Sequence, residues 1–155
     1  MRHGTRGFVV WWVMLAVLLT GCASLPRDPG GTLERIRSTG VLRVGASPSE
    51  GFVTIEGGTV TGPEADLATA FADSLGATVE WHPGGEAELV AAMEDGRLDL
   101  MVAGLTDETP WADQVSLTRP WTTSEGRRTK HVLAVPLGEN ATLVALETFL
   151  DSRTS

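Results

Sequence analysis

Strand-like and helix-like segments alternate along most of this chain, and the alternation constrains its fold more than any other feature. The predicted main strands are residues 41–46, 78–81 and 98–103, and the predicted helices between and around them are 33–38, 64–75 and 86–94. Residues 98–103 are apolar except for Asp99, which is typical of a strand covered on both faces. The pattern therefore predicts an α/β fold with a mostly parallel sheet between helices.

The ends of the predicted elements carry recognisable signals. Thr32 is a candidate N-cap for the first helix, and Gly40 is a candidate stop. Residues 52–55 and 59–61 read as a hairpin that turns at 56–58. Ligands of open parallel sheets bind beyond the carboxyl ends of the strands. In this sequence those ends are residues 46–52, 81–85 and 104–109.

The N-terminal segment resembles a bacterial lipoprotein signal. Arg2 and Arg6 precede an unbroken apolar run at residues 8–19, and Gly21 then leads to Cys22. A helix of that run would reach only about 18 Å, against a bilayer core of roughly 30 Å. We therefore expect a cleaved signal peptide rather than a permanent transmembrane anchor.

The lipoprotein resemblance implies that Cys22, the single cysteine, is acylated and anchors the protein to the membrane. The alternative, a buried free cysteine, is disfavoured because no core-forming segment surrounds it. Ala23 rather than aspartate follows, which favours the outer membrane in a cell that has one. The expected location is the cell envelope, with the folded part facing the periplasm.

Cleavage before Cys22 would leave 134 residues, enough for one domain. The loss of Arg2 and Arg6 would leave ten basic against twenty acidic residues, so nucleic acid is not an expected partner. One cysteine permits no internal disulfide, so an apolar core must supply the stability. The predicted organisation is a signal peptide at 1–21, a flexible tether at 22–31 and one lobe at 32–155.

Seven short motifs follow one another along residues 33–121. They are LERI at 33–36, GVLRVG at 40–45, GPEADLA at 62–68, LVAAM at 89–93, GRLDL at 96–100, AGLT at 103–106 and TRPW at 118–121. Their order and spacing, over about residues 32–121, resemble the first lobe of family 3 solute-binding proteins, the extracytoplasmic receptors of ABC importers. The resemblance implies one three-layer lobe of a type II periplasmic-binding-protein fold.

The family normally has two lobes that close on a ligand, but only 34 residues follow Trp121 here. They read as a basic linker at 124–130, a strand at 131–136 and an amphipathic helix at 140–150. This tail resembles the family's C-terminal return segment, which adds an antiparallel strand to the first lobe. The alternative is that 131–150 begin a truncated second lobe. The return segment is preferred because the alternative leaves an apolar strand and helix without cover.

The resemblance also indicates candidate ligand-binding residues, namely Phe52, Glu64, Gly104, Thr106, Trp111 and Arg119. Phe52 is the counterpart of an aromatic residue that covers the ligand, or else a core residue of the hairpin. Gly104 and Thr106 stand where the family donates hydrogen bonds to a carboxylate, although Thr106 is also a candidate cap for the following turn. Arg119 is either a rim residue or a solvated loop residue.

Trp111 is the main departure from the family pattern. Amino-acid receptors carry an arginine at this position, whose planar guanidinium binds the α-carboxylate of the ligand through two hydrogen bonds. A tryptophan cannot make those bonds. Trp81, Trp111 and Trp121 together suggest an aromatic surface for an apolar or ring-bearing ligand or for a protein, and ordinary core packing is the alternative for each.

The sequence predicts no catalytic residue, metal site or cofactor. His82 and His131 lack the spacing of metal ligands, and nothing indicates a pair of carboxylates with divergent pKa values among Glu64, Asp66, Asp99 and Asp107. The family resemblance includes dehydratases and modules that accompany peptidoglycan-cleaving domains, and both need more chain than is present here. An enzyme fragment is therefore the last-ranked hypothesis.

Two functional hypotheses remain ahead of it. The first is a non-enzymatic, lipid-anchored lobe that binds an amino acid or related solute, with an ABC permease as a candidate partner. Because one lobe encloses little of a ligand, we expect an affinity in the high micromolar range or weaker. The second is an envelope interaction protein that uses the same face to dock a protein or a second copy, as a homodimer.

Overall fold

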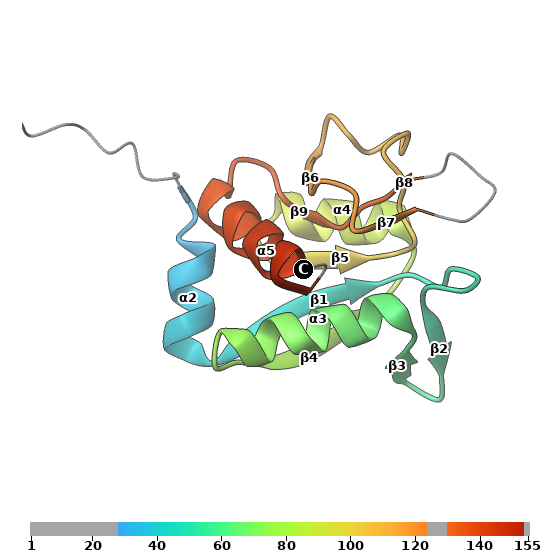
Figure 1. Cartoon of the computed structure of the whole chain (residues 1–155), viewed down its shortest axis with the longest axis horizontal. Helices are drawn as coiled ribbons and strands as arrows, with labels where there is room; N and C mark the ends of the chain where they lie inside the picture. The colour runs from blue at the N-terminus through green and yellow to red at the C-terminus, as the bar shows by residue number, and fades with distance from the viewer. Residues whose placement is uncertain (1–27, 124–129, 154–155) are drawn as a thin grey trace, which may run out of the picture.

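A five-stranded sheet forms the centre of the computed structural model, which describes residues 28–123 and 130–153 of the chain (Figure 1). The strand order is β4-β1-β5-β9-β6. β1 (Val41–Ala46) pairs in parallel with β4 (Thr78–Pro83) and with β5 (Leu100–Val102). β9 (Ala134–Pro136) pairs antiparallel with β5 and with β6 (Val115–Leu117). Within this sheet β9 alone runs against the other strands, which confirms the mostly parallel α/β fold.

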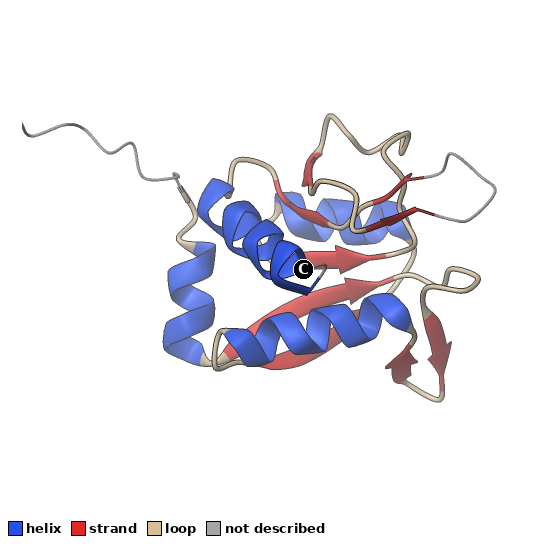
Figure 2. Ribbon diagram, in the orientation of Figure 1, coloured by secondary structure: helices blue, strands red, loops and turns tan. Residues whose placement is uncertain are grey.

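Helices cover both faces of the sheet (Figure 2). The helices α2 (Thr32–Thr39), α3 (Pro63–Ser74) and α5 (Asn140–Arg153) pack on one face, and α4 (Glu86–Glu94) packs on the other. This is the three-layer lobe that the sequence predicts. In the part of the chain that the structure describes, no helix is both long and apolar enough to cross a membrane.

Each face of the sheet has its own apolar core because successive strand side chains point in opposite directions. Leu42 and Val44 of β1 join the core that contains Phe71 of α3 and Leu146 of α5. The opposite core contains Met101 of β5 and Ala134 of β9, together with the buried side chains of α4. β5 is therefore covered on both faces, as its apolar sequence predicts.

The C-terminal segment completes the sheet. β9 lies between β5 and β6, with Met101 opposite Ala134 and Ser116 opposite Val135. Leu146 and Leu150 of α5 are buried against the same core as α3. The return-segment interpretation is confirmed, and the alternative that residues 131–150 begin a second lobe is wrong.

A terminal hydrogen-bond cluster joins the start of the described chain to α5. Asp28 accepts bonds from the backbone N–H of Leu33, at 2.7 Å, and of Thr142, at 3.3 Å. The buried carboxylate of Glu139 accepts bonds from the backbone N–H of Gly30, at 2.6 Å, and of Thr32, at 3.1 Å. These carboxylates cap α2 in place of the predicted Thr32 cap, which makes no such bond. Residues 28–31 of the predicted tether are therefore fixed to the lobe.

One buried ion cluster lies at the amino end of the sheet. Asp99 is fully buried and accepts hydrogen bonds from the guanidinium of Arg43 at 2.6 and 3.1 Å and from the backbone N–H of Arg43 at 2.9 Å. Arg35 of α2 forms an ion pair with the same carboxylate. Asp99 thus links α2, β1 and the segment before β5, which explains the single charge in an apolar run.

The remaining elements are short. β2 (Thr54–Glu56) and β3 (Thr59–Thr61) form the predicted hairpin, and its turn uses Gly57 and Gly58, both at positive φ. β7 (Thr122–Thr123) and β8 (Lys130–His131) form a second antiparallel pair, and neither β6 nor β7 was predicted. The predicted signal peptide, Cys22, residues 22–27 of the tether and linker residues 124–129 lie outside the described residues.

Candidate functional site

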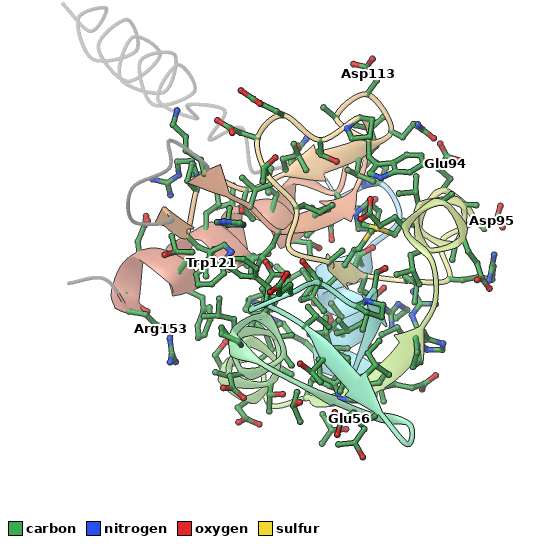
Figure 3. The ribbon with its side chains drawn as sticks, turned by 90° about the vertical axis from the view of Figure 1, so that its right-hand side faces the viewer. Glu56, Glu94, Asp95, Asp113, Trp121 and Arg153 are labelled. Carbon is green, nitrogen blue, oxygen red and sulfur yellow. The ribbon has the colours of Figure 1, made fainter. Side chains whose placement is uncertain are left out.

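The candidate site lies where β1 and β5 end, the edge at which open parallel sheets bind ligands. Figure 3 looks toward this end of the molecule, onto the hairpin and the loops that follow the strands. The loop after β1 carries Phe52, the loop after β5 carries Gly104 and Thr106, and α3 begins with Pro63 and Glu64 beside them.

Glu64 connects these elements. Its side chain is fully buried, and its Oε2 atom accepts hydrogen bonds from the backbone N–H groups of Ala103 and Gly104, both at 2.9 Å. The backbone N–H of Glu64 donates to the carbonyl of Phe52 at 3.3 Å. A side chain at the start of α3 therefore fixes the loops after β1 and β5 relative to each other.

Burial raises the pKa of Glu64 to about 7, because the charged carboxylate loses its hydration. The two backbone hydrogen bonds favour the charged form and limit the shift. The Trp121 indole also lowers this pKa, because its N–H dipole favours the charged carboxylate. Among the described residues, neither Trp121 Nε1 nor Glu64 Oε1 has a partner with the geometry of a hydrogen bond.

Aromatic side chains gather next to Glu64. The Phe52 ring stacks on the His131 ring with centroids 4.0 Å apart, and it meets Trp121 edge to face at 6.2 Å. Trp121 is labelled in Figure 3. Phe52 and Trp121 are half-buried, whereas His131 is buried. Phe52 also packs against the core below the hairpin, so its two predicted roles, ligand contact and core residue, are compatible.

Gly104 allows two loops to approach each other. It has a φ of +62°, and a Cβ atom at this position would overlap the side chain of Ser49 in the loop after β1. Glycine is therefore required here by both conformation and space. Thr106, two residues on, forms an isolated antiparallel bridge with His131, and its carbonyl accepts from the backbone N–H of Thr109.

Trp111 lies beside the neighbouring loop, at the start of α4. Its Nε1 atom donates to Glu86 Oε2 at 2.7 Å, and its ring packs against the α4 core. Arg119 is directed elsewhere: it pairs with Glu147 at 3.3 Å and with Asp151 at 2.8 Å, both on α5. The hydrogen bond that Arg119 donates to Asp151, together with the charges of both acids, raises the pKa of Arg119.

The structure thus brings Phe52, Glu64, Gly104 and Thr106 together, leaves Trp111 at the side, and holds Arg119 against α5. Sequence reasoning named Trp121 only as part of an aromatic surface, and it left His131 and Ser49 out of the candidate set. Trp121 and His131 lie on either side of residues 124–129 in the sequence, and that position was the available signal. Nothing in the local sequence of Ser49 marks it.

The described residues contain no group of three or more histidine, cysteine, aspartate or glutamate side chains that could hold a metal ion. Asp66, Asp99 and Asp107 do not join Glu64: Asp66 is exposed on α3, Asp99 belongs to the ion cluster at the amino end, and Asp107 pairs with Lys130 at 3.5 Å. The site is therefore built of aromatic rings, backbone amides and one buried carboxyl group.

A hollow of about 560 Å³ opens at the other end of the sheet. Its lining includes Arg35, Arg43, Glu94, Asp113 and Leu137. The two arginines already share Asp99, so the hollow offers no uncommitted pair of cations. It also lies away from the carboxyl ends of the strands, where ligands of such sheets bind.

The fold matches domains of solved amino-acid receptors. Domain 1 of TmArgBP, in its arginine-bound form, aligns with 76% of this chain and 97% of that domain, with a TM-score of 0.70 and 22% identity. The ancestral cationic amino-acid solute-binding protein AncCDT-1 aligns with 79% of this chain and 93% of its own, with a TM-score of 0.70 and 17% identity. At these identities the likeness establishes the fold.

The relatives found by sequence are named as enzymes rather than as receptors. The membrane-bound lytic murein transglycosylase F of Vibrio cholerae is 36% identical over 100 residues, which is 63% of this chain and 18% of that protein. Transglycosylase F 2 of Alkalilimnicola ehrlichii is 40% identical over 96 residues, which is 61% of this chain and 21% of that protein. The chain spans about a fifth of the length of these relatives.

The model of the bacterial extracellular solute-binding proteins, family 3, matches residues 42–151. That span runs from β1 to α5 and includes β9, so it covers the return segment as well as the first strands and helices. The chain belongs to the bacterial extracellular solute-binding proteins, family 3.

Proposed function

We propose that the chain is an exported, lipid-anchored, non-enzymatic lobe that holds a small amino-acid-like solute against the loops after β1 and β5. The observation that carries this proposal is the assembly of Phe52, Glu64 and Gly104 at the ligand-binding edge of a family 3 fold. An aromatic ring, a tightly fixed glycine loop and a buried carboxyl group suit a polar solute with an apolar part.

A structural neighbour supports binding by one lobe. Domain 1 of TmArgBP is a single domain in an arginine-bound form, and nearly its whole length aligns with this chain. One lobe leaves a face of the ligand open to water, and tight small-molecule sites bury most of the ligand. We therefore expect a dissociation constant of about 100 μM or weaker, equivalent to roughly 5.5 kcal/mol of binding free energy.

Calorimetric titration of the full chain in nonionic detergent with the twenty amino acids tests this function. At least one amino acid should bind with a dissociation constant in the high micromolar range. Gly104→Ala should weaken that binding at least tenfold, because the added methyl group displaces Ser49 from the loop after β1. The absence of binding by any amino acid would refute the function, and nanomolar binding would refute the argument from the open face.

The anchor is a separate part of the proposal. A small residue before Cys22 and the apolar run at 8–19 support lipid attachment at that thiol, with an ABC permease as the candidate partner in the same envelope. Cys22→Ser should abolish labelling of the protein with a radioactive fatty acid and release it from the membrane fraction. Equal labelling of the variant and the parent would exclude Cys22 as the attachment site.

The curated relatives favour a second candidate function. Because they are named membrane-bound lytic murein transglycosylases, the lobe is also a candidate for docking another envelope protein or a second copy through the same face. Light scattering over a hundredfold range of concentration tests self-association. A mass that rises to twice that of the single chain, and a Trp121→Ala variant that stays monomeric, would favour docking over solute binding.

A further inference from the structure

We infer that the lobe rests against the lipid bilayer with the end that carries the start of α2, so that the candidate site opens away from the membrane. The inference rests on the proposed lipid attachment at Cys22 and goes beyond it, because attachment alone leaves the orientation of the lobe open. It is supported by the point where the chain enters the lobe, by the short chain before that point, and by the place where apolar side chains are exposed.

The chain enters the lobe at the end of the sheet opposite the candidate site. The backbone N–H groups of Gly30 and Thr32 donate to Glu139, which follows β9, and Asp28 accepts from the start of α5. Because β9 runs against β1 and β5, its last residue lies where those two strands begin. In Figure 1, α2 lies at the left, whereas the hairpin of β2 and β3, beside the candidate site, lies at the right. A lipid attached ahead of Asp28 is therefore connected to the amino end of the sheet.

Little chain is available to turn the lobe over. The hydrogen bonds of Asp28 and Gly30 hold the chain to the lobe from residue 28 onward. Six fully extended residue steps, from Cys22 to Asp28, reach about 20 Å at most. A folded domain of about 120 residues has a radius of gyration of about 14 Å and is roughly 35 Å across. The available chain is therefore too short to pass along the lobe and bring the opposite end to the lipid.

Exposed apolar side chains lie at the same end. Among the described residues, the large apolar side chains that are exposed are Leu137, at 63%, and Val144, at 46%. Leu137 lies two residues before Glu139, which binds Gly30, and Val144 lies two residues after Thr142, which binds Asp28. Apolar side chains gain free energy when they leave water for the interface of a bilayer. Their position therefore favours contact of this end with lipid.

This orientation limits which partner can meet the candidate site. A protein in the anchoring membrane faces the amino end of the sheet, whereas the loops after β1 and β5 face the aqueous space beyond the lobe. A solute or a protein that approaches from that space reaches the site without hindrance from the bilayer. A permease that receives solute directly from this lobe must therefore stand in a second membrane across that space.

Energy transfer to a dye in the membrane measures the orientation. The acylated full chain, in vesicles of phosphatidylethanolamine and phosphatidylglycerol, would carry a donor dye on one introduced cysteine, because acylation blocks Cys22. Asn140→Cys places the dye at the start of α5, and Glu56→Cys places it on the hairpin, and both side chains are exposed. With a rhodamine-labelled lipid as acceptor, transfer should be at least twofold more efficient for Asn140→Cys than for Glu56→Cys. Equal efficiencies, or greater transfer for Glu56→Cys, would overturn the inference.

A longer tether is the control. About forty Gly and Ser residues inserted between Arg27 and Asp28 would span about 35 Å on average, as much as the lobe itself, so they should lower the ratio of the two efficiencies toward one. A ratio that the insertion leaves unchanged would overturn the argument from tether length. Cosedimentation with the vesicles reports lipid attachment separately. A chain that fails to cosediment would refute the attachment and this inference together, whereas equal transfer by a chain that cosediments would refute the orientation alone.

Discussion

At each end of the sheet, one buried acidic side chain joins neighbouring elements. Glu64 fixes the loops at the carboxyl end, and Asp99 fixes α2 and β1 at the amino end. Both are fully buried acids, but their surroundings differ. Asp99 faces two guanidinium groups, whereas the neighbours of Glu64 are amides and rings. Burial is therefore compensated by opposite charge at Asp99 and is only partly compensated at Glu64.

The raised pKa of Glu64 makes stability depend on pH. Because the folded chain holds this proton up to a pH of about 7 and the unfolded chain releases it near 4.5, the proton's contribution is complete below pH 4.5 and is lost as the pH rises through 7. The loss amounts to about 3 kcal/mol. Glu64→Gln removes this titration. The difference in unfolding free energy between parent and Glu64→Gln, measured in urea, should change by about 2–3 kcal/mol between pH 5 and pH 8, and a constant difference would contradict the assignment.

Asp99 stabilises the fold through its ion pairs with Arg35 and Arg43. Removing one partner from a buried ion cluster typically costs about 3–5 kcal/mol, because the remaining charges lose their partner. Asp99→Asn should therefore lower the free energy of unfolding by about that amount in urea denaturation at pH 7. Asp95→Asn, which removes an exposed partner of Arg97, is the control and should cost less than about 1 kcal/mol. Similar losses in the two variants would contradict the proposed role of Asp99.

At the scale of elements, the terminal hydrogen-bond cluster ties α2 to α5. Asp28 and Glu139 come from opposite ends of the described chain, and each accepts backbone N–H groups that helix starts leave unpaired. The negative charge of Glu139 also suits the positive end of the α2 dipole. These hydrogen bonds therefore join the start of the described chain to the start of α5.

Glu139→Gln should weaken the hydrogen bonds from the backbone N–H groups of Gly30 and Thr32 while keeping the shape of the side chain. We expect a loss of about 1–2 kcal/mol in the free energy of unfolding, since hydrogen bonds to charged groups contribute about that much. Glu56→Gln, on the exposed hairpin, is the matched control and should change stability by less than about 0.5 kcal/mol. Urea denaturation of the two variants measures both values, and equal stabilities would exclude a capping role for Glu139.

The elements show what the sequence could and could not predict. β1, the hairpin and α4 were predicted closely because their patterns are local. β6 was missed because its three residues owe their conformation to β9, a segment that follows them in the chain. The first helix and its stop at Gly40 were predicted, but its N-terminal caps were not, since Asp28 and Glu139 reach it through the folded chain. The same holds for the candidate site. Phe52, Glu64 and Gly104 were predicted from the family resemblance of the motifs around them, whereas the contacts of Trp121 and His131 with Phe52 form only in the folded chain.

At the scale of the whole molecule, the return segment makes one lobe complete. β9 fills the position between β5 and β6, and α5 covers the core that α2 and α3 share. The family resemblance and the structure agree on this point. The lobe is similar in sequence to part of the murein transglycosylase F of Vibrio cholerae, and it shares its fold with domain 1 of TmArgBP.

Removal of the return segment tests whether the lobe depends on it. A chain that ends at Trp121 would lack β9 and α5, so β5 would lose a neighbour and the core would lose Leu146 and Leu150. We expect this truncation to lose its cooperative thermal transition in circular dichroism. A chain that ends at Arg153 removes only Thr154 and Ser155 and should melt like the parent. A cooperative transition in the shorter chain would show that residues 130–153 are dispensable.

Hydrogen exchange with and without a saturating bound solute tests the central claim most directly, that this one lobe binds its solute at the carboxyl ends of β1 and β5. The twenty amino acids are the solutes to use. We expect slower exchange in residues 47–52 and 103–109 and unchanged exchange in 93–97 and 136–138, which border the hollow at the opposite end. Protection confined to 93–97 and 136–138 would contradict it.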